Sequence, residues 1–269
     1  MKLFFLLCFS CIAGLCRAQE IKMFVEDLRP GHILYASNKE PCAVSISLQL
    51  DLTNLEFSEG ITTIFVIPAY TERMKLGELK IVNRTSRTSY SYRYKSTWGD
   101  ALKTGQLQDY VYDLPYQKGK NFFVVQGYNG RFSHRGENAI DFSMPEGTPV
   151  VAAREGTVIK VVQHNVESCT EADCAQYNNY VLILHNDGSF SKYIHLKYNG
   201  SKVKAGDAVN KGDVIALSGN TGFSAGPHLH FVCFVPGFPK YKSLTTKFKV
   251  DDGSKEMVLE EKKKYTRDY

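Results

Sequence analysis

Two histidines that lie two residues apart are the first feature of the sequence that could perform chemistry. They belong to the run GPHLHF at residues 226–231, whose apolar character is typical of a β-strand. Residues two apart on a strand point to the same side, so His228 and His230 share a face with Val232. Imidazole is the commonest metal ligand in proteins, yet such a pair is also common among purely structural histidines. The pair alone therefore predicts a polar cleft floor and leaves a metal open.

Two further histidines, His134 and His195, lie in the same half of the chain, each where a strand meets a glycine-rich or polar stretch. The remaining three of the seven histidines are scattered, and we expect them to be structural or solvated: His32, His164 and His185. Tyr193 alternates with His195 along its strand and is expected to serve packing.

Several separated motifs around these histidines resemble those of the lysostaphin-like (LytM-type) zinc endopeptidases. The motifs are SHRGENAIDFSMPEGTPV from Ser133, AAREGTV from Ala152, YIHL from Tyr193, and VKAGDAVNKGDVIALSGNTGFSAGPHLHF from Val203. The resemblance covers roughly residues 114–239, and the motifs keep the order and spacing of the family. It implies a mostly antiparallel β fold with an active-site groove.

The resemblance also implies roles for five residues. One Zn²⁺ per chain would be held by His134, Asp141 and His230, whereas His195 and His228 would be the catalytic residues. Two imidazoles and one carboxylate leave zinc a net positive charge and an open position for water, which is acidified toward a pKa of about 7. The two catalytic histidines would divide proton transfer and stabilisation of the oxyanion, in an order that the sequence does not give.

The first motif departs from the commonest pattern of the family, which has three residues between histidine and aspartate. Here six residues separate His134 from Asp141, and simple counting reaches Asn138, with Glu137 adjacent. An amide is a poorer zinc ligand than a carboxylate. Because Asp141 opens the stretch DFSMPEGTPV, which best matches the residues after the family's aspartate, we expect a bulge or a longer turn before it. Asp141 is the predicted ligand, and Glu137 is its rival.

The resemblance predicts a zinc metalloendopeptidase that cuts peptide bonds, above all in peptidoglycan cross-bridges or similar peptides of small residues. The alternative is a non-catalytic cell-wall-binding or regulatory protein of the same fold, since some proteins of this kind have lost their ligands. All predicted ligand positions are filled here, which favours the enzyme.

Alternating strands predict an all-β chain of two domains. In PCAVSISLQLDL, from Pro41, every second residue from Cys42 to Leu52 is apolar, as in a half-buried strand. Similar runs come after it, and they predict an N-terminal immunoglobulin-like β-sandwich over residues 19–113. Proline, glycine and lysines in LPYQKGK, from Leu114, mark the boundary to the endopeptidase domain, residues 114–240. Residues 241–269 are predicted to be a charged hairpin with a frayed tail.

The first 18 residues have the features of a signal peptide, with Lys2 before an apolar stretch and Ala18 at the end. The stretch is shorter than the roughly 20 residues of a membrane-spanning helix. We therefore expect a secreted or periplasmic protein without an integral membrane segment. Loss of Lys2 and Arg17 lowers the formal net charge from +5 to +3, which does not indicate nucleic acid.

Four cysteines remain after cleavage of the leader. In an oxidising compartment Cys169 and Cys174 could close a surface loop, and Cys42 and Cys233 could either pair across the domains or stay as buried thiols. The sequence does not indicate an oligomeric state.

Overall fold

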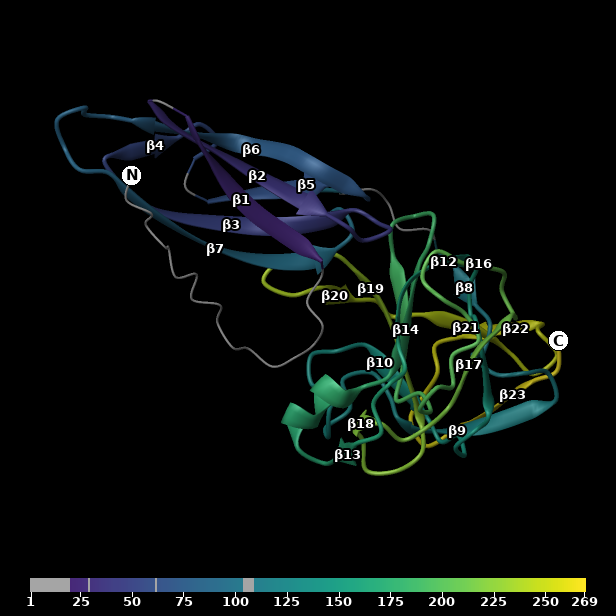
Figure 1. Cartoon of the computed structure of the whole chain (residues 1–269). Helices are drawn as coiled ribbons and strands as arrows, with labels where there is room; N and C mark the ends of the chain where they lie inside the picture. The colour runs from purple at the N-terminus through teal and green to yellow at the C-terminus, as the bar shows by residue number, and fades with distance from the viewer. Residues whose placement is uncertain (1–19, 29, 61, 104–108) are drawn as a thin grey trace.

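The computed structural model describes residues 20–28, 30–60, 62–103 and 109–269, so the expected signal peptide lies outside the described residues. Within this part of the chain the one helical segment is a short 3-10 helix, η1 (Ala172–Tyr177), and the other elements are strands. The predicted all-β class is therefore confirmed (Figure 1). Among the described residues no helix has the length and apolar composition needed to cross a membrane.

The N-terminal part folds into two facing sheets. Its seven strands are β1 (Ile21–Leu28), β2 (Gly31–Asn38), β3 (Val44–Thr53), β4 (Leu55–Phe57), β5 (Thr62–Ile67), β6 (Thr71–Ile81) and β7 (Ser89–Trp98). One sheet has the order β1-β2-β6-β4 and the other the order β5-β3-β7. The predicted alternation holds in β3, where Val44, Ile46 and Leu48 are buried and enter the core between the sheets. This part of the chain is a β-sandwich.

The immunoglobulin topology predicted for the sandwich is not confirmed. In immunoglobulin domains the first, second, fifth and fourth strands form one sheet, and the third, sixth and seventh form the other. Here the sixth strand, β6, lies between β2 and β4, and β5 pairs with β3 instead. Alternating apolar residues predict that a strand is half buried, but they do not say which strand lies beside it.

The second part is built around a large antiparallel sheet of nine strands. The order along this sheet is β16 (Ala208–Val209), β12 (Gly156–Val162), β14 (Tyr180–Leu184), β15 (Phe190–Ile194), β19 (Leu229–Val235), β10 (Ala139–Phe142), β9 (Lys120–Gln126) and β23 (Lys264–Arg267), with β20 (Lys242–Ser243) beside β19. Smaller sheets pair β11 (Pro149–Val151) with β17 (Val214–Leu217), β13 (Ser168–Cys169) with β18 (Gly222–Phe223), and β22 (Lys255–Met257) with β21 (Lys247–Val250) and β8 (Val111–Tyr112).

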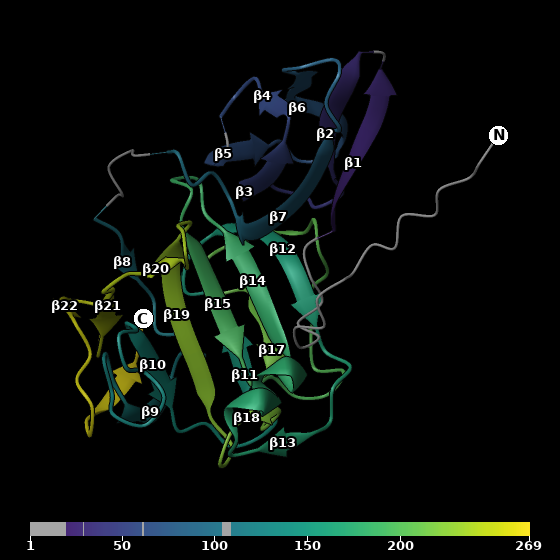
Figure 2. The ribbon, with the colours of Figure 1, turned by 90° about the vertical axis from the view of Figure 1, so that its left-hand side faces the viewer.

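The two faces of the large sheet have different neighbours. One face carries the main core of this domain, which includes Tyr193, Leu229 and Phe231. The opposite face is covered at one end by the sandwich, where Cys42 and Trp98 pack against Phe234 and neighbouring apolar residues. Figure 2 looks onto this second face, with the sandwich above it and β13 and β18 at the other end of the strands. The sandwich thus packs against one end of this face.

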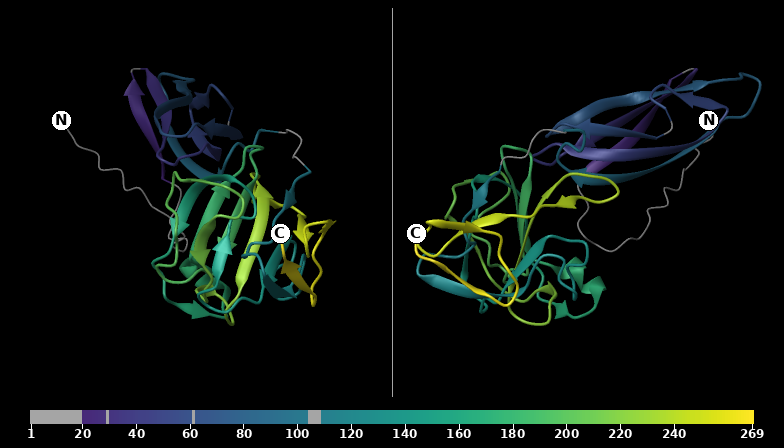
Figure 3. Two further views of the ribbon diagram at one scale, coloured as in Figure 1. Left: turned by 90° about the vertical axis from the view of Figure 1, so that its right-hand side faces the viewer. Right: turned by 180° about the vertical axis from the view of Figure 1, so that it is seen from behind.

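The structure adds detail at both ends of the second domain. Tyr112, in β8, belongs to the core of this domain and precedes the predicted boundary at Leu114. Residues 241–269 contain the hairpin of β21 and β22, but their end is not frayed, because β23 pairs with β9 (Figure 3). Tyr265 is buried there, and Arg267 forms an ion pair with Asp113 at 3.0 Å. Tyr265 and Arg267 are thus the buried residues of this last strand.

The four cysteines of the described chain resolve into one disulfide and two thiols. Cys169 and Cys174 form the expected loop disulfide. Cys42 and Cys233 are both free and buried, and burial raises the pKa of each thiol to about 12. They lie on opposite faces of the large sheet, Cys42 under the sandwich and Cys233 in the main core, so pairing across the domains does not occur.

His185 follows β14 and is a structural histidine, as predicted. Its side chain is buried, with Nδ1 2.7 Å from the Glu155 carbonyl oxygen and Nε2 3.0 Å from Ser191 Oγ. Burial lowers the pKa of His185 to about 4. The folded state therefore favours neutral His185, and the resulting stability is present above pH 6.5 and lost as the pH falls toward 4.

This titration predicts an acid-sensitive fold. Between pH 7 and pH 5 the free energy of unfolding should fall by about 2 kcal/mol through His185 alone. Urea unfolding at the two pH values checks it, comparing wild type with His185→Gln and with a control at the exposed His164, His164→Gln. We expect a smaller pH-dependent loss only in His185→Gln, and equal losses in all three proteins would contradict the prediction.

Candidate active site

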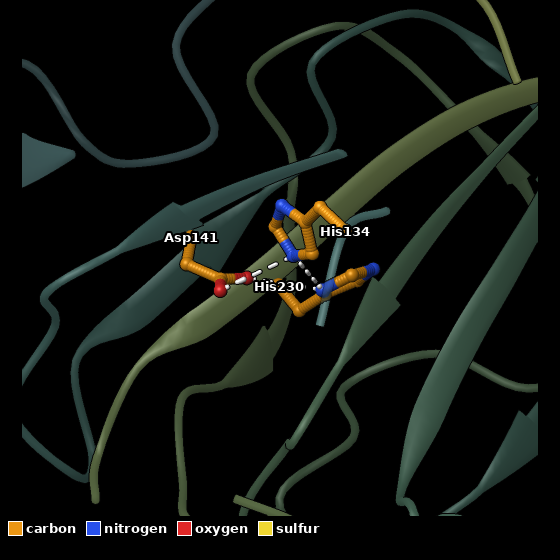
Figure 4. A group of neighbouring side chains, drawn as sticks. All are labelled: His134, Asp141 and His230. Atoms are coloured by element: carbon orange, nitrogen blue, oxygen red, sulfur yellow. Dashed lines mark hydrogen bonds and ion pairs between the residues drawn. The ribbon is translucent and has the colours of Figure 1, made fainter. Parts of the chain in front are cut away.

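Three predicted ligands meet at the edge where β10 and β19 pair. Asp141 of β10 lies directly opposite His230 of β19 in the antiparallel register, and His134 comes from the loop between β9 and β10. His134 Nε2 lies 3.1 Å from His230 Nδ1 and 3.2 Å from Asp141 Oδ2. His230 Nδ1 lies 3.0 Å from Asp141 Oδ1. Figure 4 shows the two rings and the carboxylate pointing toward one another.

Neighbouring groups fix the orientation of this cluster. His134 Nδ1 lies 2.9 Å from the Gly127 carbonyl oxygen and donates its proton there, so Nε2 is the nitrogen that faces the cluster. Gln126 Nε2 donates to Asp141 Oδ2 at 3.0 Å. Gln126 was not among the predicted site residues, although β9 pairs with β10 and places it beside Asp141.

The electrostatics of the cluster are those of a carboxylate between two imidazoles. Burial opposes ionisation of Asp141, but hydrogen bonds from His134 and His230 outweigh it and hold the pKa of Asp141 well below its ordinary value. Burial likewise opposes protonation of His134, and the hydrogen bond with Asp141 outweighs it and raises the pKa of His134. An ionised carboxylate thus lies beside two imidazole nitrogens that converge on it, and such a donor set suits a cation.

His195 and His228, the two predicted catalytic residues, lie beside this cluster. Their ring centres are 4.4 Å apart, and the His195 ring is 5.9 Å from that of His230. His195 directly follows β15 and has a φ of 63°, a left-handed conformation that is unusual for a residue with a side chain. This conformation turns the backbone at the end of the strand beside the histidine pair.

Backbone carbonyls orient both rings. His195 Nδ1 lies 2.7 Å from the Thr221 carbonyl oxygen, and His228 Nδ1 lies 2.8 Å from that of Gly226. Each Nδ1–H therefore donates to a carbonyl oxygen, and each Nε2 is the nitrogen that can exchange a proton with a substrate or water. Burial, together with His228 and His230 nearby, lowers the pKa of His195 well below its ordinary value, which keeps the ring neutral.

Glu137, the rival ligand, lies outside the three-residue cluster. The extra residues after His134 form a turn in which Glu137 N donates to the His134 carbonyl oxygen at 2.9 Å and Gly136 has a φ of 70°. Glu137 instead accepts a hydrogen bond from Tyr241. The expected longer turn is thus present, and it brings Asp141 to the cluster.

Asp141, His195, His228 and His230 line a cavity of about 610 Å³, here called the main cavity. Phe132 and Phe223 stack at its rim with ring centres 6.0 Å apart, and Phe132 is 70% exposed. The disulfide loop supports this rim, because β13 pairs with β18, which carries Phe223. Tyr193, in contrast, is buried in the main core, as expected of a packing residue.

Comparison with known protein families assigns most of this domain to one of them. Residues 135–239 match the family described as Peptidase family M23. The chain contains an M23 peptidase domain. Four of the five predicted site residues lie within the matched part of the M23 domain, and His134 immediately precedes it.

Relatives of the M23 domain include a protein named for its action on peptidoglycan. Peptidoglycan DD-endopeptidase ShyA of Vibrio cholerae is 32% identical over 173 residues, which cover 63% of this chain and 37% of that protein. Lysostaphin of Staphylococcus simulans is 33% identical over 159 residues, or 58% of this chain and 26% of that protein. The solved catalytic domain of lysostaphin from Staphylococcus simulans aligns at 29% identity with a TM-score of 0.35, covering 46% of this chain and 86% of that chain. The chain spans well under half the length of these curated relatives.

Proposed function

We propose that this chain is an exported zinc metalloendopeptidase that hydrolyses peptide bonds of peptidoglycan, above all in its cross-bridges. One observation carries the proposal: Asp141 and His230, two members of the cluster with His134, line the same cavity as His195 and His228. Residues 19–113 would then be an accessory sandwich, and the domain predicted at residues 114–240 would be the catalytic one.

The cluster fits a zinc ion by the chemistry of its donors. Its ligand atoms lie within 4.8 Å of one another, and its two imidazole nitrogens and one carboxylate are a common catalytic zinc set. The Gly127 carbonyl oxygen accepts from His134 Nδ1, and Gln126 Nε2 donates to Asp141 Oδ2. Such hydrogen bonds usually orient the side chains that bind a metal. Zinc bound there would supply a Lewis acid that polarises the scissile carbonyl group and acidifies a water molecule.

His195 and His228 would handle the protons of the reaction. His195 is buried and neutral, and its Nδ1 is engaged by Thr221, so Nε2 can accept the proton of the attacking water. His228 is less buried, and its Nε2 lies 3.8 Å from Asp141 Oδ1 on the side of the ring that faces the cluster. When this nitrogen carries a proton, Nε2–H can donate to the oxyanion or to the departing amine.

The names of the relatives support the substrate. ShyA of Vibrio cholerae is named a peptidoglycan DD-endopeptidase. A peptidoglycan substrate requires export, which agrees with the leader predicted from the sequence. Protein recovered from the medium should therefore begin at Gln19, and an intact leader on that protein would contradict export.

Zinc content and hydrolysis together test the function. We expect purified protein to bind about one zinc per chain, to release soluble peptide fragments from peptidoglycan, and to lose this release when a chelator removes the metal. Metal analysis and chromatography of the released fragments measure the two properties. A protein that holds no zinc and releases nothing from several peptidoglycan types would instead be a non-catalytic wall-binding protein.

A further inference from the structure

A second cavity lies at the seam between the sandwich and the large sheet. It has a volume of about 240 Å³, and we call it the seam cavity. The sandwich contributes the end of β7 with Trp98, and the large sheet contributes Leu182 and Phe234. Lys192 and Tyr241 line both this cavity and the main cavity. The two cavities are therefore neighbours on one face of the sheet.

The strand register gives the spacing between the two cavities. On β15 and β19, Ile194 lies opposite His230, and Phe190 lies opposite Phe234. His230 and Phe234 are thus four residues apart along one strand, or roughly 13 Å. A peptide bound in an extended conformation along this face, with its scissile bond at the histidines, would reach the seam cavity after about four residues.

The seam cavity is lined by cationic and aromatic side chains, as an anion-binding site is. Of the described residues that line it, two are lysines, Lys192 and Lys240, and none is acidic. Trp98, Phe234 and Tyr241 supply aromatic surface. Tyr241 is held by a hydrogen bond to Glu137, and its ring centre lies 4.4 Å from that of Phe234.

The sandwich is held firmly enough to contribute to such a site. Trp98 packs against both the core of the sandwich and the apolar cluster beneath it. Lys160 of the sheet also forms an ion pair with Glu40 of the sandwich at 3.4 Å. The wall that the sandwich provides is therefore part of one packed assembly.

We propose that the seam cavity is a substrate subsite for a carboxylate-bearing segment of the peptide, about four residues from the scissile bond. The inference rests on the proposed function, because it places the scissile bond at the histidines. Lys192 and Lys240 bind the carboxylate by charge-assisted hydrogen bonds, and Trp98 covers the adjoining chain. The seam cavity thereby selects substrates by length and charge.

Trp98 is the one tryptophan of the chain, so its fluorescence reports on occupancy of the seam cavity without any need for catalysis. The probes are peptides of five glycines with one glutamate at either end, and matched peptides with glutamine. We expect a saturable change with one glutamate peptide and an affinity roughly tenfold lower for its glutamine counterpart. Lys240→Glu should remove this difference, whereas Lys204→Glu, at an exposed lysine outside both cavities, should keep it.

Kinetics separate the subsite from the catalytic function. With zinc-loaded protein, the acidic extension should raise kcat/KM by roughly tenfold over the glutamine peptide. Lys240→Glu should abolish this gain, whereas Lys204→Glu should keep it. Cleavage without any preference for the acidic peptide would overturn the subsite and leave the function intact. Fluorescence that responds equally to glutamine peptides or to a neutral glycan oligomer would also overturn it. Absence of all cleavage would refute the function, and the fluorescence titration would still decide the subsite.

Discussion

Replacing His195 with alanine should lower kcat by about 10²- to 10⁴-fold, the usual contribution of a positioned general base. His195 Nδ1 donates its hydrogen to the Thr221 carbonyl oxygen, and the ring is neutral. Nε2 therefore has a lone pair that can accept the proton of water. The zinc content should stay at that of wild type, since His195 is not part of the ligand cluster. Steady-state kinetics and metal analysis of the same preparation measure both.

The matched control is His164→Ala, which removes an exposed imidazole outside the main cavity and should leave kcat unchanged. His228→Ala should also lose activity and keep its metal. Full activity in both His195→Ala and His228→Ala would contradict the proposed roles of the pair, whatever the metal content.

Asp141→Asn should weaken zinc binding by at least about 100-fold. Changing a residue that only hydrogen-bonds to a metal ligand already weakens binding by up to about 100-fold, and a change of the ligand itself should cost more. The amide removes the negative charge that lies 3.0 Å from His230 Nδ1 and 3.2 Å from His134 Nε2. Hydrolysis should fall together with the zinc content. Titration of metal-free protein with zinc in the presence of a competing chelator gives the affinity.

Glu137→Gln is the matched test for the rival ligand. Because Glu137 faces Tyr241 and lies outside the cluster, this variant should bind zinc as wild type does. If Glu137→Gln lost its zinc and Asp141→Asn retained it, the assignment of the carboxylate ligand would be reversed.

The sequence was sufficient to predict which residues gather at the site, because they lie in motifs whose types and spacing carry the information. His228 and His230 share a strand face, and the stretch after Asp141 distinguishes it from Glu137 despite the longer turn. Gln126 and the carbonyl groups of Gly127 and Thr221 were not predicted. They reach the site through long-range pairing and loop closure, which local patterns do not encode.

The arrangement of the sandwich was the least predictable part. Its strands can be predicted from alternation, but their order depends on which apolar faces meet, and the immunoglobulin order did not result. The sequence also could not decide whether Cys42 and Cys233 pair. The answer depends on how the sandwich packs on the sheet, and this packing puts the two thiols on opposite sides of the sheet. Likewise, β23 could not be predicted from the charged residues around Tyr265, because it forms by pairing with β9, a strand far away in the sequence.

Mass spectrometry of the products from a defined cross-linked peptidoglycan tests the central claim most directly. Zinc-loaded wild type should generate new amino and carboxyl termini within the peptide bridges and leave the glycan strands uncut, whereas His228→Ala with its zinc retained should generate almost none. Cuts in the glycan strands, or the same peptide products from wild type and His228→Ala, would contradict the account.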